Sequence, residues 1–334
     1  MRLKIDSLEA RPVSVPFLIV RIIARGRKTH AELIEVTLTS GGVTGRGQCC
    51  PVDRYNETHE SVFAQIEAAK PALLKGCSRL ELHDLMPPGA ARNAVDCAMW
   101  DLEAKLSGRT ADVIAGLDPV KPVTTVYTLP LESPEAMAAR ALEQRDRPLI
   151  KIKLGHFADD RARLEGIRRN APNATLVVDA NEGWSLAELT EMAKVAADCN
   201  VAMIEQPIHA TRDEAIIGFE SAIPIGADES VHTRADLEKV ISRGYKVVNI
   251  KLDKTGGLTE ALELAKAARA KGLDVMVGCM SGMTLAMAPG YLIAQYCKFV
   301  DLDSPIYLPP EPAPEIVYDG SVITWAPTRR WGAL

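Results

Sequence analysis

The sequence predicts an α/β protein, a modified TIM barrel of the (β/α)7β type that carries an α+β capping domain. From residue 123 onward, short Val- and Ile-rich segments recur about every 23 to 28 residues, and amphipathic stretches separate them. Such segments are typical of parallel strands that are buried on both faces of a sheet. Several of them end in a charged residue, and barrel enzymes carry their catalytic groups at the carboxyl ends of the strands.

Composition argues against several classes of protein. A chain of 334 residues has room for one barrel of about 250 residues and a smaller domain. The net charge of -5, with no basic run that holds aromatic residues, argues against nucleic-acid binding. The N-terminus lacks the apolar segment of a signal peptide and no run of 18 apolar residues occurs, so we expect a cytoplasmic protein without a membrane partner. The seven cysteines form no CxxC pair and are predicted to be reduced thiols.

Residues 1–115 predict the capping domain. The first 50 residues alternate as antiparallel strands do, with a turn at Ser40-Gly41-Gly42. From about residue 56 to 106 the pattern is helical, and Gly108 suits the end of the second helix. We therefore expect a sheet with two helices packed on it.

The segment from residue 16 to 30 is predicted to be a loop rather than a finished strand. It carries Arg21, Arg25 and Arg27 next to Gly26. Arginines on a loop form either a solvated face or a bidentate grip on a small carboxylate. The residues of this segment alone are compatible with both interpretations.

Residues 116–307 predict the barrel. Each gap between its strands is expected to hold one amphipathic helix, which gives eight strands and seven helices. No helix follows the last strand. The tail, residues 308–334, instead alternates like a strand hairpin and is predicted to return to the first domain. The strands are expected near Thr125, Lys151, Val177, Met203, Ile225, Ile250, Val277 and Val300.

Three carboxylates end successive predicted strands. Asp179, Glu205 and Asp228 are about 25 residues apart, so in a barrel they lie side by side at one rim. Adjacent carboxylates repel each other unless a cation lies among them, and an all-oxygen ligand set favours a hard ion such as Mg²⁺. The sequence therefore predicts a site for one Mg²⁺ per subunit.

Lysines flank the predicted metal site on both sides. Lys151 and Lys153 lie two apart on one strand, so both point towards the barrel interior, and Lys251 ends a later strand. A lysine near another lysine and a cation is expected to have a lowered pKa, which suits a general base. The alternative is that these lysines only neutralise the acids, although buried ion pairs carry a desolvation cost.

A cation between two facing bases suits the removal of a weakly acidic proton next to a carboxylate. The metal would stabilise the enediolate, one lysine would take the α-proton, and the other would return a proton to the opposite face. Two lysines therefore predict epimerisation or racemisation rather than elimination. Asp301 and Asp303 share one face of the last strand, and they either close the barrel as structural charges or receive a substrate ammonium group. The second interpretation predicts an amino acid or short peptide as substrate.

The motifs AARNAVDCAMWDL, IKIKL, VVDANEGW, IEQP, GADES and NIKLDKTGGLTEAL resemble the enolase superfamily, and within it the muconate-lactonising subgroup. The likeness extends over nearly the whole chain. The DLD motif resembles that of the subgroup's dipeptide epimerases, which implies Mg²⁺-dependent epimerisation of a dipeptide such as L-Ala-D-Glu or L-Ala-L-Glu. It also implies a role in murein-peptide recycling or another dipeptide pool.

The resemblance implies a role for each matching residue. Lys153 and Lys251 would be the two acid/base catalysts, and Lys151 would tune Lys153 and contact the substrate carboxylate. The stretch before the loop arginine is longer than usual in the family, so Arg21 is an alternative to Arg25 as the group that grips the glutamate side chain. The metal ligands would be Asp179, Glu205 and Asp228, and the other substrate-binding residues would be Thr128, Cys279, Asp301 and Asp303.

Three other functions compete with this hypothesis. One is epimerisation of hydrophobic or cationic dipeptides. A second is a cycloisomerase or an o-succinylbenzoate synthase-like enzyme, against which the two aspartates of DLD argue because those substrates carry no ammonium group. The third is a barrel that binds its ligand without turnover, against which the presence of all five charged catalytic positions argues. The outer helices show no apolar seam that would mark an oligomer interface.

Overall fold

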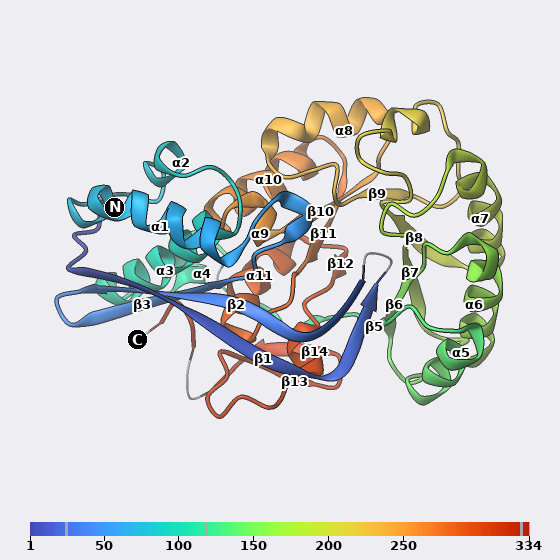
Figure 1. Cartoon of the computed structure of the whole chain (residues 1–334), viewed down its shortest axis with the longest axis horizontal. Coiled ribbons are helices and arrows are strands. Elements are labelled where there is room, and N and C mark those ends of the chain that lie inside the picture. Colours follow the sequence, from blue (N-terminus) through green and yellow to red (C-terminus); the bar gives the residue numbers. More distant parts are fainter. Residues whose placement is uncertain (24–25, 118, 328–329, 334) are drawn as a thin grey trace.

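An eight-stranded parallel sheet forms the barrel, and the order of its strands follows the chain. The computed structural model describes residues 1–23, 26–117, 119–327 and 330–333, and Figure 1 shows the barrel beside a smaller unit that contains the N-terminus. The predicted fold class is confirmed. The strands are β5 (Tyr127–Leu129), β6 (Leu149–Lys153), β7 (Thr175–Asp179), β8 (Val201–Glu205), β9 (Ile225–Ala227), β10 (Val247–Lys251), β11 (Asp274–Gly278) and β12 (Phe299–Val300).

Amphipathic helices connect most of the strands and cover the outside of the barrel (Figure 1). Local sequence sets where they begin: Ser185 accepts a hydrogen bond from Glu188 N, and the Glu188 side chain accepts one from Ser185 N. Leu189 and Met192 of the same helix are buried in the main apolar cluster of the barrel. The helices are α5 (Pro134–Glu143), α6 (Phe157–Asn170), α7 (Leu186–Asp198), α8 (Leu237–Arg243), α10 (Leu258–Ala270) and α11 (Thr284–Ile293).

One connection departs from the prediction of a helix in every gap. Between β8 and β9 the chain forms only the 3-10 turn Asp213–Ile216. Asp213 is fully buried, where the Arg243 guanidinium and the Ser230 hydroxyl bind its carboxylate. Gly218 follows in the left-handed region at φ 78°, so the turn ends before a helical face can form. The buried Asp213 carboxylate therefore holds this connection in place, where the prediction expected the apolar face of an amphipathic helix.

The barrel closes through the segment that precedes β5. The sequence placed one strand around Thr125, whereas the structure divides residues 123–130 between two sheets. Here β4 (Val123–Thr124) pairs with the C-terminal hairpin, and Val126 N then donates to Val300 O of β12 at 2.8 Å. The expected strand is therefore shorter than predicted, because the chain changes partners at this point.

The capping unit packs helices against a three-stranded antiparallel sheet. Its strand β3 (Val43–Cys49) lies against α3 (Ala90–Ser107), and a Cβ at Gly47 would lie 2.1 Å from Ala94 O. Glycine at this position therefore allows the helix to approach the strand backbone. The predicted end of α3 is confirmed, because Gly108 adopts a left-handed conformation. The remaining elements are β1 (Ser7–Ile23), β2 (Gly26–Ser40), α1 (His59–Leu74), α2 (Leu82–Leu85) and α4 (Ala111–Ala115).

The predicted loop over residues 16–30 is instead strand wherever the structure describes it. β1 and β2 form one long hairpin, and their pairing resumes at Arg21 with Lys28 after a register shift beyond Pro16. Strand pairing satisfies backbone hydrogen-bonding groups that a loop would leave to water, so the loop prediction was wrong. Arg25 lies outside the described residues.

The predicted C-terminal hairpin is present and forms a third sheet with β4. Its strands are β13 (Ile316–Asp319) and β14 (Val322–Trp325). Two contacts link this tail to the capping sheet: Trp331 Nε1 donates to Arg46 O at 3.0 Å, and the Arg46 side chain forms an ion pair with Glu315. In Figure 1 the C-terminus accordingly lies near β3.

All seven cysteines are free thiols, as the sequence predicted. Within the described ranges, every helix is too short or too polar to cross a membrane.

We predict that Gly47→Ala destabilises the protein by about 2 kcal/mol or more, because the added methyl group would overlap the α3 backbone. Thr44→Ala, on the exposed face of the same strand, is the matched control. Urea unfolding measures both variants. Equal free energies of unfolding for Gly47→Ala and the wild type would contradict the close approach.

Candidate active site

The three predicted metal acids lie on neighbouring strand ends. Asp179 ends β7 and is paired in register with Glu205, which ends β8, while Asp228 directly follows β9. Their exposed fractions are 0%, 0% and 1%, so all three carboxylates are below the surface of the barrel rim. Parallel strands in register bring their carboxyl ends to one edge, which explains why residues so distant in sequence lie together.

The lysines of β6 bind these carboxylates directly. Lys151 Nζ lies 3.1 Å from Asp179 Oδ2, 2.8 Å from Glu205 Oε2 and 2.7 Å from Asp301 Oδ2. Lys153 Nζ lies 2.6 Å from Asp179 Oδ2. The two lysines therefore share one face of the strand, as their spacing predicted.

Asp228 is held by a second pair of lysines. Lys251 Nζ, at the end of β10, lies 2.7 Å from Asp228 Oδ2, and Lys254 Nζ lies 2.6 Å from Asp228 Oδ1. Lys254 belongs to α9 (Leu252–Thr255), the single helical turn after β10, and also donates to Asn249 O at 3.0 Å. Sequence reasoning missed Lys254. Its spacing of three residues from Lys251 could have predicted this contact, because one helical turn after the strand brings a side chain back to the same rim of the barrel.

Direct contact with carboxylates raises the pKa values of two lysines. Burial alone would lower the pKa of Lys251, but the Asp228 carboxylate raises it above its usual range. The pKa of Lys151 is likewise raised, because the carboxylates of Asp301 and Glu205 outweigh its burial. Direct ion pairs between these lysines and the acids are the alternative that the sequence left open, and an adjacent carboxylate favours the charged form of a lysine.

The donor groups at these strand ends fit a hard divalent cation. Burial and the nearby Asp179 carboxylate raise the pKa of Glu205 to about 7, which reflects how closely the acids are crowded. The buried Oδ1 atoms of Asn181 and Asn249 accept no hydrogen bond from any described residue. Carboxylate and amide oxygens are the ligands that Mg²⁺ prefers, so the arrangement suits such an ion.

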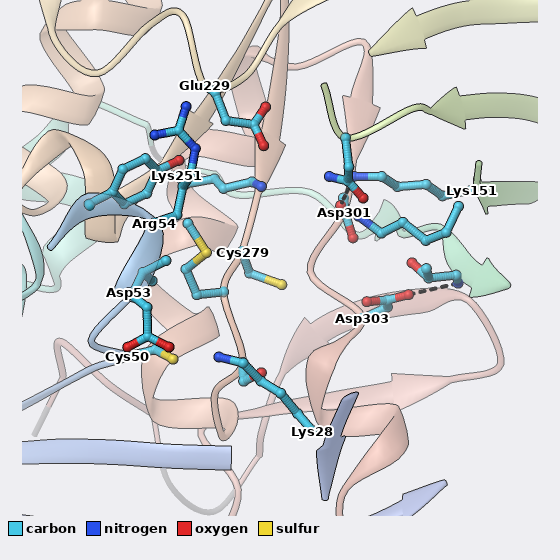
Figure 2. Close-up of a pocket in the computed structure, with 17 residues that line it drawn as sticks. Lys28, Cys50, Asp53, Arg54, Lys151, Glu229, Lys251, Cys279, Asp301 and Asp303 are labelled. Atoms are coloured by element: carbon cyan, nitrogen blue, oxygen red, sulfur yellow. Dashed lines mark hydrogen bonds and ion pairs between the residues drawn. The ribbon is translucent and has the colours of Figure 1, made fainter. Parts of the chain in front are cut away.

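A cavity of about 490 Å³ lies above these ion pairs, between the barrel and the cap. Figure 2 shows Lys151 and Lys251 reaching into it from opposite sides. The predicted residues Lys153, Thr128 and Cys279 also line it, whereas the metal acids lie beneath its wall. The cap contributes Lys28, Cys50, Val52, Asp53, Arg54 and Tyr55.

Asp301 and Asp303 form an acidic wall of the cavity together with Cys279. Ligand atoms of these three residues lie within 4.8 Å of one another. Asp303 Oδ2 accepts hydrogen bonds from Thr128 N at 2.8 Å and from the Tyr307 hydroxyl at 3.2 Å. The two aspartates therefore lie together, but not on one face of a strand as predicted, because β12 ends at Val300 and Asp303 has a helical backbone conformation. Thr128 contacts the acidic wall through its backbone N–H group.

A cap loop that the sequence analysis did not identify is fixed to the barrel. Arg54 Nε and Nη2 donate to Glu182 Oε2 and Oε1 at 3.0 and 2.9 Å. Glu182 Oε1 also accepts from Ala210 N at 2.8 Å, so this carboxylate joins the loops after β7 and β8 to the cap. The Tyr55 and His232 rings pack edge to face with centroids 4.8 Å apart.

Comparison with known proteins identifies the family. Residues 9–112 match the N-terminal domain of mandelate racemase / muconate lactonizing enzyme, and residues 135–310 match the enolase C-terminal domain-like family. The chain belongs to the enolase superfamily. This membership agrees with the resemblance seen in the motifs at the strand ends.

Relatives within the enolase superfamily cover nearly the whole chain. L-Ala-D/L-Glu epimerase of Escherichia coli (strain K12) is 42% identical over 93% of this chain and 95% of its own length. N-acetyl-D-glutamate racemase of a Pseudoalteromonas species is 42% identical over 82% and 87%. An Agrobacterium tumefaciens enolase family member with homology to dipeptide epimerases, solved with sodium and L-Ala-L-Glu, is 45% identical with a TM-score of 0.94 over 97% and 99%. The protein is an isomerase of the enolase superfamily.

We predict that the two hydrogen bonds between Arg54 and Glu182 couple the cap to this enolase-superfamily barrel. In a double-mutant cycle with Arg54→Met and Glu182→Gln, we expect a coupling of about 1 kcal/mol in the free energy of unfolding, because the pair is bidentate and Glu182 is nearly buried. The exposed pair of Arg161 and Glu165 serves as the control, with a smaller coupling. Additive effects of the Arg54 and Glu182 variants would show that the loop is held by other contacts.

Proposed function

We propose that the protein epimerises a dipeptide, L-Ala-D-Glu to L-Ala-L-Glu and back, by proton transfer between Lys153 and Lys251. One observation carries the proposal: lysines from β6 and β10 line one cavity above three buried acids. The E. coli relative named L-Ala-D/L-Glu epimerase and the relative solved with L-Ala-L-Glu support the choice of substrate.

Two lysines suit an inversion because a proton has to leave one face of the α-carbon and return to the other. Lys153 Nζ would hold or take the proton on one side, and Lys251 Nζ would do so on the other. Both ammonium groups are bound to carboxylates, through Asp179 and Asp228, which fixes their positions at the cavity floor. Cap residues line the cavity on the side opposite the barrel.

Asp179, Glu205 and Asp228 would hold one Mg²⁺ per subunit. When bound, such an ion places positive charge next to the substrate carboxylate, which makes the neighbouring α-proton more acidic. The sodium in the Agrobacterium relative is likewise a hard cation, and it is bound together with a dipeptide.

The remaining residues would orient the substrate. Asp301 and Asp303 would bind its ammonium group, with Thr128 and Cys279 at their side, because these groups form one acidic wall of the cavity. Lys151 would tune Lys153 and contact the substrate carboxylate. Arg25 is assigned to the glutamate side chain by family resemblance.

Racemisation of an N-acyl glutamate is a second candidate, because the N-acetyl-D-glutamate racemase is as similar in sequence as the epimerase. The two substrates differ at the amino end: an acetyl group carries no charge, whereas a dipeptide carries an ammonium group. The acidic wall of Asp301 and Asp303 favours the dipeptide.

We predict loss of the glutamate α-proton signal when the protein is incubated with Mg²⁺ and L-Ala-L-Glu in D2O, with appearance of the L-Ala-D-Glu diastereomer. Proton NMR measures both. Faster exchange of N-acetyl-L-glutamate under the same conditions would select the racemase candidate. Absence of exchange in every dipeptide and N-acyl amino acid would remove both candidates.

Lys153→Ala and Lys251→Ala are each expected to lower the rate of interconversion by about 100-fold or more, because each removes one acid/base group. The measurement is initial interconversion from both diastereomers, followed by NMR. Lys246→Ala, which removes an exposed lysine next to β10, is the control and should retain the wild-type rate. Interconversion at the wild-type rate by either the Lys153→Ala or the Lys251→Ala variant would exclude the two-base mechanism.

Removal of divalent ions with EDTA is expected to abolish interconversion and lower the melting temperature, since the buried acids lose a cation. Added Mg²⁺ should restore both. Activity that survives exhaustive chelation would contradict the proposed metal site.

A further inference from the structure

The cap helix α3 binds the barrel segment that follows the cavity lysine Lys251. This helix packs against the cap strand β3 and also against α9 and α10 of the barrel. Three of its buried polar side chains form hydrogen bonds with the barrel segment: Arg92, Asn93 and Asp96. The first two turns of α3 therefore hold the chain that leaves the end of β10.

Hydrogen bonds from α3 fix the turn between α9 and α10. Arg92 Nη2 donates to Thr255 O at 2.7 Å, and Arg92 Nε donates to Gly256 O at 3.1 Å. Asp96 Oδ2 accepts from Thr259 N at 2.9 Å, at the beginning of α10. Gly256 has a φ of 72°, and a Cβ there would lie 2.4 Å from Arg92 Nε, so the turn fits closely against the cap helix.

Asp253 joins α9 to two parts of the cap. It lies two residues after Lys251, and its Oδ1 atom accepts from Asn93 Nδ2 at 2.8 Å and from Cys50 N at 3.1 Å. Asp253 and Asn93 are 8% and 3% exposed, so their hydrogen bond is shielded from water. Figure 2 shows Cys50 and Lys251 on the same side of the cavity, away from Lys151.

The end of β10 is held by the sheet on one side. β9 pairs with β10 at Val247 and Val248, whereas β11 continues as far as Lys251, which is paired with Gly278. Within the described ranges, the last three residues of β10 therefore have one neighbouring strand. The hydrogen bonds of Asp253 add a second attachment, and it comes from the cap.

We propose that Asp253 is a positioning residue for Lys251, and that α3 holds it in place through Asn93. This inference rests on the proposed function, in which Lys251 carries the proton on one face of the α-carbon. Proton transfer requires the two heavy atoms to lie within hydrogen-bond reach, and a displacement of about 1 Å can lower a rate about 100-fold. One of the two proton carriers therefore depends on the cap for its position.

The other proposed proton carrier, Lys153, is attached within the barrel. Leu154, which follows it, donates through its backbone N to Asp179 O at 2.9 Å. Loss of the Asp253 contacts is therefore expected to move Lys251 and to leave Lys153 in place. A general loss of stability would instead affect both lysines.

The test separates inversion from exchange without inversion, in D2O with Mg²⁺. Proton NMR follows L-Ala-L-Glu and L-Ala-D-Glu separately and gives two initial rates for each: appearance of the other diastereomer, and loss of the glutamate α-proton with the configuration retained. Retention requires one lysine to take the proton, exchange it with solvent and return a deuteron to the same face. Lys251→Ala identifies the diastereomer that Lys153 deprotonates, because only that substrate should still exchange.

Asp253→Ala should lower inversion about tenfold or more, because Lys251 is displaced. Exchange with retention should stay within about twofold of the wild type for the diastereomer that Lys153 deprotonates. Asn93→Ala removes the same hydrogen bond from the side of α3 and should give the same pattern, so it decides the question if Asp253→Ala does not fold.

Asp253→Asn is the conservative variant and should restore most of the inversion rate. It keeps an oxygen that can accept from Asn93 and Cys50. Burial raises the pKa of Asp253 to about 7, so this position does not require a charged group.

Thr259→Val is the matched control at the same interface, eight residues beyond Lys251. The Thr259 hydroxyl donates to Asp96 Oδ1 at 2.6 Å, so the variant loses a buried bond between α3 and α10. We expect a lower melting temperature and an unchanged ratio of inversion to exchange with retention.

Equal losses of both rates in Asp253→Ala and Asn93→Ala, with a lowered melting temperature, would show that the contact is only structural and would overturn the assignment. Wild-type inversion in these variants would overturn it as well and would leave the proposed function intact. If the wild type inverts neither the dipeptides nor N-acetylglutamate, the proposed function fails, and the role assigned to Asp253 fails with it.

Discussion

Charge neutralisation in a dry environment is the constraint on which the site depends. Asp179, Glu205 and Asp228 are almost fully buried, and each contacts a lysine ammonium group within 3.1 Å. An unpaired charge at this depth would cost several kcal/mol, so each acid needs a positive partner, and in this structure the lysines supply it. Strand register does the pairing: Lys153 and Asp179 are partners across β6 and β7, and Asp179 and Glu205 across β7 and β8.

The barrel and the cap divide the work of the cavity. The barrel supplies the lysines that we propose as proton carriers, and both end strands whose positions the sheet fixes. The cap supplies the opposite wall, and Glu182 joins it to two barrel loops through Arg54 and Ala210 N. Residues of the cap wall can therefore change without moving the charged groups at the strand ends.

The ion pairs of Asp228 with Lys251 and Lys254 affect both the stability of the fold and the protonation of a lysine in the cavity. Lys251 has a raised pKa because Asp228 is its direct partner, and Lys254 occupies the other oxygen of that carboxylate. A group that binds Asp228 competes with these lysines, so ligand binding and lysine protonation are linked at this point. The buried charges therefore stabilise the fold and also link ligand binding to the protonation of the lysines.

The sequence by itself determined the parallel sheet, the charged strand ends and the face shared by Lys151 and Lys153, because periodicity along a strand is a local property. It also indicated the family through motifs such as NIKLDKTGGLTEAL. Tertiary structure alone decided the rest. Two features depend on partners more than 100 residues away: the division of residues 123–130 between two sheets, and the contact of Arg54 with Glu182. A third, the strand pairing of residue 28, depends on the register across a hairpin. No local pattern encodes such partners, since they are chosen by packing and by the pairing of buried charge.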